Sequence, residues 1–218
     1  MQFILALVII LISYLLGSIP FGLILVRIVT GKDLRRIESG RTGGTNTARA
    51  AGWWAGFLTG ALDAIKSGLA VVLANKVFPD SSWLHVLAPL AAIIGHNHSI
   101  FLIERVDGKI YLRGGAGGAP TVGGAAGLWL PSLFFTLPSM LFIWLGIGYA
   151  SLATLSSGIV ITLIFAYRAY IGASPVEYVF YGILAEVILV WALRPNIKRL
   201  LNGTERLVGW RARKTKKP

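Results

Sequence analysis

The chain has no cysteine, and it is poor in the other residues that most often serve as nucleophiles, bases or metal ligands. The absence of cysteine excludes disulfides, thiolate chemistry and cysteine-based zinc sites. The three histidines, His85, His96 and His98, do not by themselves make a metal cage. We therefore expect no metal site.

Acidic residues are scarce as well, with 9 Asp and Glu against 21 Lys and Arg and a net charge of +12. In a soluble protein this excess would indicate a nucleic-acid partner. The chain is 55% hydrophobic, however, and its mean hydropathy is +0.70, far above that of a soluble domain. The lipid bilayer is therefore the expected solvent, provided that the basic residues gather on one side of it.

Apolar stretches alternate with polar ones along the chain. The first, Phe3 to Val26, is long enough to cross a hydrocarbon core of about 30 Å, and its positive flank follows it. We interpret it as an uncleaved span and not as a signal peptide. The expected fold is an all-α integral membrane protein with seven transmembrane helices, some of them short: 3–26, 53–77, 83–103, 119–131, 134–148, 151–168 and 176–193.

The basic residues are distributed unevenly between the two sides of this arrangement. The segments after the first, third and last predicted helices hold 18 of the 21 Lys and Arg residues. Such segments lie in the cytoplasm, so we expect the N-terminus outside and the C-terminus inside. This distribution explains the net charge without nucleic acid. We expect one membrane domain over residues 1–207, followed by a basic, flexible cytoplasmic tail over 208–218.

Three polar segments fall on the cytoplasmic side: 39–49 (SGRTGGTNTAR), 113–121 (RGGAGGAPT) and 196–205 (NIKRLLNGTE). In the second, a glycine run leads into a helix, where backbone N–H groups and the helix dipole suit a phosphate. A simple glycine-rich turn, or small residues for close helix packing, is the alternative. The convergence of the three segments is the main functional indication.

Three charged residues, Asp63, Lys66 and Glu186, lie well inside predicted spans and away from their ends, where charges are costly. Asp63 and Lys66 are three positions apart and share one helix face. They form either an ion pair or, in the interpretation that we favour, a group in which Lys66 reaches an anionic substrate. Glu186 has no evident partner, and a protonated interior glutamate is as good an interpretation as any functional role.

The polar segments resemble motifs of the bacterial acyl-phosphate-dependent glycerol-3-phosphate acyltransferases, the PlsY family. Residues 39–49 resemble its Ser-Gly-Asn-x-Gly-x-Thr-Asn-x-x-Arg motif, residues 63–68 its Asp-x-x-Lys-Gly, and residues 95–102 its Gly-His-x-x-Pro-Val-Phe. Residues 17–22 and 196–205 also fit the family. The resemblance covers about residues 14–207, so the chain is identified as a diverged member.

The resemblance implies transfer of an acyl group from acyl phosphate to the 1-hydroxyl of glycerol 3-phosphate. The products are lysophosphatidic acid and phosphate, in the first acylation of phospholipid biosynthesis. The family needs no cofactor, acyl-CoA or nucleotide, and its partners are its two substrates and membrane lipids. The resemblance also implies a multi-pass protein of the bacterial inner membrane with its active site on the cytoplasmic side; oligomeric state is left open.

Site residues follow from the same motifs. The expected catalytic residues are Ser39, Asn46, Arg49 and Lys66. The residues expected to bind substrate phosphate are Gly43, Thr45, His96, Arg113, Gly114, Gly115, Gly117, Gly118, Asn196, Arg199 and Glu205. We see no strong protein base, so we expect a substrate phosphate oxygen to take the hydroxyl proton, with positioning and electrostatics giving much of the acceleration.

The chain departs from the family pattern at several positions. Arg41 stands where the family has asparagine, and Ala116 stands where its glycine loop has a second lysine. Leu193 replaces a histidine, and the loop over 104–111 is longer. Arg41 is a possible compensating cation for the missing lysine. The alternatives are a catalytically weakened paralogue that binds phosphate or lipid and, less favoured because no internal repeat is seen, a small transporter.

Overall fold

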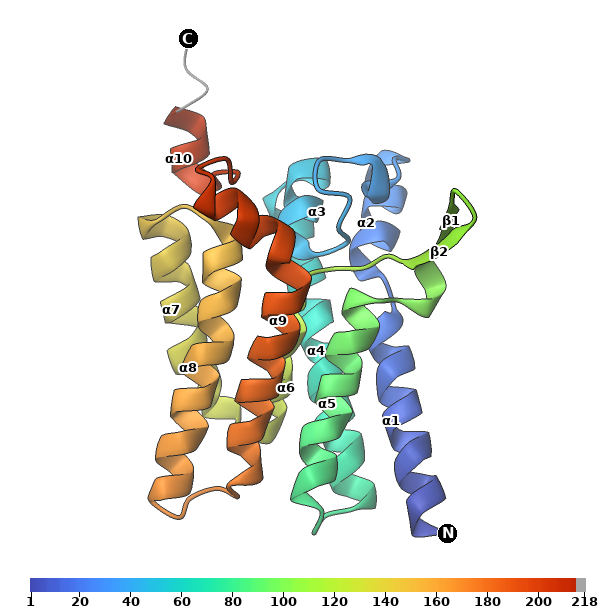
Figure 1. The fold of residues 1–218 in the computed structure, drawn as a ribbon, viewed down its shortest axis with the longest axis vertical. Coiled ribbons are helices and arrows are strands. Elements are labelled where there is room, and N and C mark those ends of the chain that lie inside the picture. The colour runs from blue at the N-terminus through green and yellow to red at the C-terminus, as the bar shows by residue number, and fades with distance from the viewer. Residues whose placement is uncertain (215–218) are drawn as a thin grey trace.

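A computed structural model describes residues 1–214 as a bundle of helices with one small hairpin. The elements are α1 (Gln2–Ser18), α2 (Phe21–Thr30), α3 (Gly44–Ala51), α4 (Trp53–Val77), α5 (Ser82–Asn97), β1 (Ile103–Val106), β2 (Lys109–Leu112), α6 (Gly118–Leu128), α7 (Leu133–Gly146), α8 (Ala150–Tyr170), α9 (Glu177–Leu201) and α10 (Gly209–Lys214). The long helices run along the long axis, and the N-terminus and helix α10 lie at opposite ends (Figure 1). The shorter elements α2, α3, α10 and the hairpin gather at the upper end.

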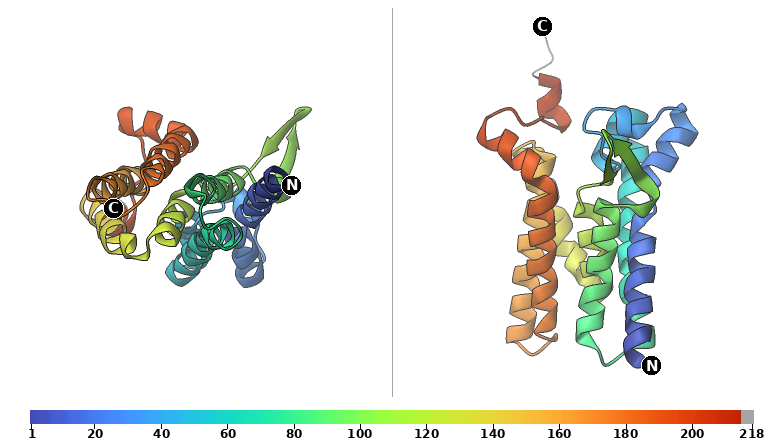
Figure 2. Two further views of the ribbon diagram at one scale, coloured as in Figure 1. Left: turned by 90° about the horizontal axis from the view of Figure 1, so that it is seen from below. Right: turned by 45° about the vertical axis from the view of Figure 1, so that its right-hand side comes forward.

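The long helices form two groups that are joined by α6 and by a contact between α5 and α9 (Figures 1 and 2). In the first group α1 packs on α5, and a β-carbon at Gly17 would fall 2.1 Å from the carbonyl oxygen of Ala92. At the contact of α4 with α6, a β-carbon at Gly123 would fall 1.9 Å from the carbonyl oxygen of Ala64. Glycine at these positions lets the backbones approach closely, as in membrane helix pairs.

Large apolar side chains cover the outside of the bundle. Phe3 on α1, Phe57 on α4, Phe134 and Phe142 on α7, and Leu163 on α8 are each exposed by 65% or more. Within residues 1–214, four helical stretches are long and apolar enough to cross a bilayer: 2–30, which joins α1 and α2, and helices α4, α8 and α9. The chain therefore has the surface and the helix lengths of an integral membrane protein.

The first predicted helix is broken. Residues 3–26 were expected to form one helix, but α1 ends at Ser18 and α2 begins at Phe21. Pro20 has no N–H to donate and drives the residue before it out of the helical region, and Ile19 is extended (φ −61°, ψ 118°). The break frees the carbonyl of Ile19, which becomes part of the site described below.

The all-α prediction and the third predicted helix, 83–103, are also corrected. Helix α5 ends at Asn97, and the next residues form the antiparallel pair β1–β2, in which Ile103 faces Leu112. Asp107 and Gly108 turn the chain with positive φ (49° and 75°), the conformation that an Asp-Gly hairpin requires. The Asp-Gly dipeptide was the available sequence signal. The hairpin projects sideways from the bundle (Figure 2).

Two further predictions need correction. Helix α9 runs to Leu201, well past the predicted end at residue 193. Part of the tail that was expected to be flexible is helix α10, whose Trp210 donates its indole N–H to the carbonyl of Leu145; residues 215–218 lie outside the described part. The division of the middle region into helices over 118–128, 133–146 and 150–170 agrees with the prediction to within three residues.

Candidate active site

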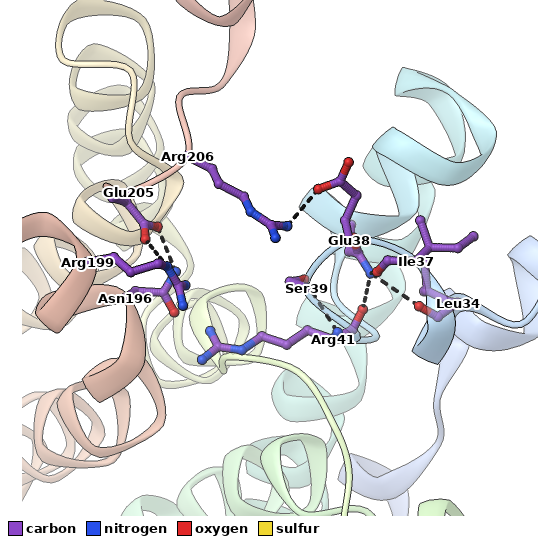
Figure 3. A network of polar contacts seen from close by, with 10 residues as sticks. Leu34, Ile37, Glu38, Ser39, Arg41, Asn196, Arg199, Glu205 and Arg206 are labelled. Carbon is purple, nitrogen blue, oxygen red and sulfur yellow. Dashed lines mark hydrogen bonds and ion pairs between the residues drawn. The ribbon is translucent and has the colours of Figure 1, made fainter. Parts of the chain in front are cut away.

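The three polar segments meet at the upper end of the bundle, as the sequence predicts. The amide of Thr42 donates to the carbonyl of Gly114 (3.2 Å), which joins the first segment to the glycine loop. The Arg41 Nη2 atom donates to the carbonyl of Ala192 on α9 (2.6 Å). Glu38, directly before the first segment, and Arg206, directly after the third, form an ion pair of 2.6 Å between Oε2 and Nη1. Figure 3 shows the first segment (Ser39, Arg41) facing the third (Asn196, Arg199, Glu205).

A proline in α9 leaves one backbone carbonyl without its helical donor, next to the carbonyl that Arg41 contacts. Pro195 lies inside α9 and cannot donate to the carbonyl four residues earlier. That carbonyl, of Trp191, accepts from Arg194 Nε instead (3.0 Å). The next carbonyl along, of Ala192, is the one that accepts from Arg41. Two arginine side chains, of Arg194 and Arg41, thus donate to neighbouring α9 carbonyls just before Pro195.

Asn46 fixes the shape of the first segment. It is 3% exposed, and its amide Nδ2 donates to the carbonyls of Arg41 (2.8 Å) and Ile37 (3.0 Å). Its Oδ1 atom is buried and has no hydrogen-bond partner among the described residues 1–214. Ser39 lies in the loop that Asn46 holds, exposed, and its Oγ accepts from the amide of Arg41 (3.4 Å).

Gly43 and Thr45 surround the start of α3. The carbonyl of Gly43 accepts from the amides of Asn46 and Thr47 (both 3.1 Å), so Gly43 caps the helix. Thr45 is exposed in the first turn. The expected roles of these residues at a substrate stay predictions.

Glu205 is the centre of a second cluster. Its side chain is 5% exposed, and it accepts from Arg199 Nε (2.8 Å), Asn196 Nδ2 (2.7 Å) and Ser151 Oγ (3.1 Å). The carboxylate therefore orients the other two residues predicted from the third segment. Ser151 on α8 was not predicted, and nothing in its sequence neighbourhood distinguishes it.

The two clusters together carry a surplus of positive charge. Glu205 is paired with Arg199 and Glu38 with Arg206, which leaves Arg41 and Arg49 without a carboxylate partner among residues 1–214. Burial lowers the pKa of Arg41, and the nearby Arg199 lowers it further. Burial also lowers the pKa of Arg49, against the attraction of Glu38. Both groups remain charged at neutral pH, because arginine starts from such a high pKa.

The glycine loop is pressed against the end of α5. The amide of Gly115 donates to the carbonyl of His96 (2.9 Å), and a β-carbon at Gly115 would fall 1.9 Å from His96 Nε2. Gly117 caps α6 in the left-handed region (φ 96°), and Gly118 is the first residue of the helix. The loop thus delivers the start of α6 to the site, where first-turn N–H groups have no acceptor within the helix.

Asp63, Lys66 and His96 form a buried triad below this loop. Lys66 Nζ contacts Asp63 Oδ1 (2.8 Å), the Ile19 carbonyl (3.0 Å) and His96 Nδ1 (3.0 Å), and its side chain is 3% exposed. These contacts match the three protons of the ammonium group. His96 Nδ1 also lies 3.4 Å from Asp63 Oδ1, so the imidazole nitrogen faces both the ammonium group and the carboxylate. Direct contact between Lys66 and a substrate stays a prediction, and it requires one of the three contacts to break.

Arg113 points away from the loop that it precedes. Its Nε donates to Glu104 Oε2 on β1 (2.7 Å), and both side chains are at least 38% exposed. The contact belongs to the longer loop in which this chain differs from the family pattern. With Arg113 engaged and alanine at 116, the surplus cations are those of Arg41 and Arg49 on the opposite segment.

Asn97 is a candidate that the sequence argument missed. It is 6% exposed, and neither its Nδ2 nor its Oδ1 has a partner within residues 1–214. A β-carbon at Gly117 would fall 2.9 Å from Oδ1, so the amide lies against the start of α6. Buried amides are rarely left unpaired, which suits a group that meets a ligand. The available signal was its position directly after His96.

The chain is similar to known proteins over most of its length. A family profile described as glycerol-3-phosphate acyltransferase matches residues 7–203. A glycerol-3-phosphate acyltransferase of Thermus thermophilus is 35% identical over 202 residues, which cover 93% of this chain and 94% of the relative. Glycerol-3-phosphate acyltransferase 3 of Dehalococcoides mccartyi is 34% identical over 219 residues, covering 95% and 97%.

Solved structures give the same result. The crystal structure of PlsY (YgiH), an integral membrane glycerol 3-phosphate acyltransferase in its glycerol 3-phosphate form, superposes with a TM-score of 0.79 at 32% identity. The alignment covers 94% of this chain and 96% of that one. The lysophosphatidic acid form of PlsY gives 0.77 at 31% identity, covering 94% and 95%.

Proposed function

The chain belongs to the glycerol-3-phosphate acyltransferase family and acylates glycerol 3-phosphate, and we propose that it takes the acyl group from acyl phosphate at the cluster of Arg41, Arg49 and Glu205. The product is lysophosphatidic acid, the entry compound of phospholipid synthesis. The observation that supports the location is the surplus of two guanidinium groups where the three polar segments meet.

Glycerol 3-phosphate binds at the guanidinium cluster in this proposal. Arginine offers parallel N–H donors that match phosphate oxygens, and the bonds to an ionised group are shorter and stronger than neutral ones. Arg41 reaches the cluster from the first segment, and Arg199 reaches it from α9, where Glu205 holds it in place. Ser39 and Asn196 lie beside these arginines (Figure 3) and orient the glycerol hydroxyls. Arg41 then takes the place of the lysine that the glycine loop lacks.

Acyl phosphate binds at the start of α6. The N–H groups after Gly117 and the positive end of the helix dipole suit its phosphate. Asn97 supplies a donor and an acceptor directly beside these N–H groups. The acyl chain lies against the apolar helices. In this arrangement the leaving phosphate binds next to the glycine loop, and Arg41 belongs to the first segment. The hydrogen bond from Thr42 to Gly114 joins these two segments.

The reaction needs no protein base. The 1-hydroxyl oxygen forms a bond to the acyl carbon, the bond from that carbon to the phosphate oxygen breaks, and the hydroxyl proton moves to an oxygen of the phosphate. The products are the ester and hydrogen phosphate, so atoms and charge balance. Lys66 and His96 act by holding the end of α5 against the α1–α2 break, which positions the glycine loop above it. The arginines stabilise the charge that gathers on the phosphates.

We propose the same membrane arrangement that the sequence predicts: seven crossings by the single domain over residues 1–207, with the N-terminus outside and the upper end of the bundle in the cytoplasm. The support is the clustering of basic residues at one end and the apolar cover of the helices. The setting is the bacterial inner membrane. Because the chain has no cysteine, single cysteines introduced at Lys76 and at Lys198 test the arrangement. An impermeant maleimide applied to intact cells should label only the first; labelling of Lys198→Cys contradicts it.

A second candidate function is phosphate or lipid binding with little catalysis. Ala116 and the engagement of Arg113 with Glu104 are the observations that favour it. Glycerol 3-phosphate binding, measured by isothermal titration calorimetry, and phosphate release separate the two. The main proposal expects both in the wild-type chain and loss of both in Arg41→Asn/Arg49→Gln. Binding without phosphate release from acyl phosphate leaves the second candidate.

A further inference from the structure

An open depression in the surface, of about 550 Å³ and called the cavity below, lies beside the end of α2. It is lined by Arg27, Gly31, Lys32, Asp33, Arg36 and Ile37. Of these residues only Ile37 touches the candidate active site, through its carbonyl, which accepts from Asn46 Nδ2. The cavity therefore needs an explanation of its own.

Its lining is strongly cationic. Arg27, Lys32 and Arg36 are exposed, and none of them forms an ion pair within the described 214 residues. Asp33 is the one carboxylate of the lining, and it is neutralised by Arg35, whose Nη2 lies 2.7 Å from its Oδ2. This hydrogen bond lowers the pKa of Asp33 to about 2, so the pair stays ionised at neutral pH. Three cations around one cavity thus remain without a counter-charge.

The cavity lies where an apolar surface ends. Helix α2 continues the stretch 2–30, which is long and apolar enough to cross a bilayer. Ile24, Ile28 and Val29, in the turns just before the cavity, are exposed by 43%, 76% and 45%. Cations that directly follow lipid-facing apolar residues lie at the level of the lipid headgroups. This position favours a lipid over a free ion as the source of the anion.

We propose that this cavity binds the phosphate group of an anionic lipid headgroup, with Arg27, Lys32 and Arg36 as its ligands. The inference rests on the proposed placement in the membrane and is independent of the catalytic step. The negative end of the α2 dipole opposes an anion. The amide of Gly31 donates to the Arg27 carbonyl (3.0 Å) and so satisfies one of the free carbonyls at this helix end. The three cations outweigh the partial negative charge of the other carbonyls.

Native mass spectrometry of the purified full chain tests the proposal. The probes are phosphatidylglycerol and phosphatidylcholine with identical acyl chains. The site variant is Arg27→Gln/Arg36→Gln. The matched control, Arg105→Gln/Lys109→Gln, removes the same charge from the hairpin at the same end. Lys32→Gln, a single change in an exposed loop, serves if the double variant does not fold.

The wild type should bind phosphatidylglycerol more tightly than phosphatidylcholine. Each cation removed from the cavity should weaken phosphatidylglycerol binding about fivefold, and the control should behave as the wild type. Equal binding of the two lipids, or equal weakening by the site and control variants, would overturn the proposal. Displacement of phosphatidylglycerol by millimolar inorganic phosphate would overturn the lipid assignment in favour of a soluble anion. Every variant should retain acyl transfer when it is assayed in phosphatidylcholine membranes. If the wild type itself shows no acyl transfer, the proposed function fails, and the lipid site is still tested by the binding measurements.

Discussion

Replacing Arg41 by asparagine, the residue that the family has at this position, removes one of the two unpaired cations of the site. Arg41 makes one hydrogen bond to the Ala192 carbonyl at 2.6 Å and faces the side on which Asn196 and Arg199 lie (Figure 3). A hydrogen bond from a charged group to a phosphate is worth about 1.5–3 kcal/mol. Since about 1.4 kcal/mol is tenfold in rate, kcat/KM should fall by about 10- to 100-fold.

The assay is phosphate release at varied glycerol 3-phosphate, in nanodiscs of one lipid composition. The lost tie to α9 should lower stability by only about 1 kcal/mol, which thermal unfolding measures separately. Arg105→Asn, a change of the same charge on the exposed hairpin, is the control and should retain wild-type activity. Arg41→Lys keeps the charge without the paired donors and should lie between the two.

A second change makes the argument sharper. Ala116→Lys restores the lysine that the family pattern has in the glycine loop. If Arg41 compensates for that lysine, Ala116→Lys should recover most of the activity that Arg41→Asn loses, and it should add little to the wild type. Wild-type turnover in Arg41→Asn, or no recovery in the double variant, would refute the reasoning.

Three further predictions test the supports of the site. Gly115→Ala places a β-carbon 1.9 Å from the His96 imidazole and should lower both activity and thermal stability. Gly146→Ala, whose β-carbon would meet open space, is the control and should change neither. Equal effects of the two substitutions would contradict the packing argument. Lys66→Met leaves the buried Asp63 without its ammonium partner, with only His96 Nδ1 beside it at 3.4 Å, and should destabilise by about 3 kcal/mol in denaturant unfolding. Asp63→Asn/Lys66→Met should cost less, and an additive loss would exclude a coupled pair. Glu205→Gln weakens the hydrogen bonds that orient two neighbouring side chains and should raise KM for glycerol 3-phosphate about tenfold, so an unchanged KM argues against its bracing role.

The sequence predicted the location of the site better than its internal contacts. Hydropathy marks the apolar helices because each is uniformly apolar over many residues, and the basic segments mark one end. The convergence of residues 39–49, 113–121 and 196–205 was predicted on that basis. In the structure Thr42 bonds to Gly114, and Arg41 and Glu38 bond to Ala192 and Arg206, which flank the third segment; the roles of the site residues stay predictions.

Features that depend on tertiary contacts could not be read from the sequence. Pro20 breaks a helix whereas Pro195 is tolerated inside one, because Arg194 and Arg41 satisfy carbonyls near the second proline. The position of Asn97 after His96 was the one sequence signal for it, and its contact with Gly117 is visible only in the fold. The Arg113 side chain bonds to Glu104 on β1, a contact that depends on a hairpin absent from the all-α prediction.

Product analysis of the purified wild-type chain with acyl phosphate and glycerol 3-phosphate tests the central claim most directly. Lysophosphatidic acid, measured by mass spectrometry, should form together with inorganic phosphate in a ratio of one to one, without added metal, and acyl-CoA should not replace acyl phosphate. Arg41→Asn/Arg49→Gln should abolish both products while the protein remains folded. Wild-type yields in that double variant, or release of phosphate without lysophosphatidic acid, would contradict the account.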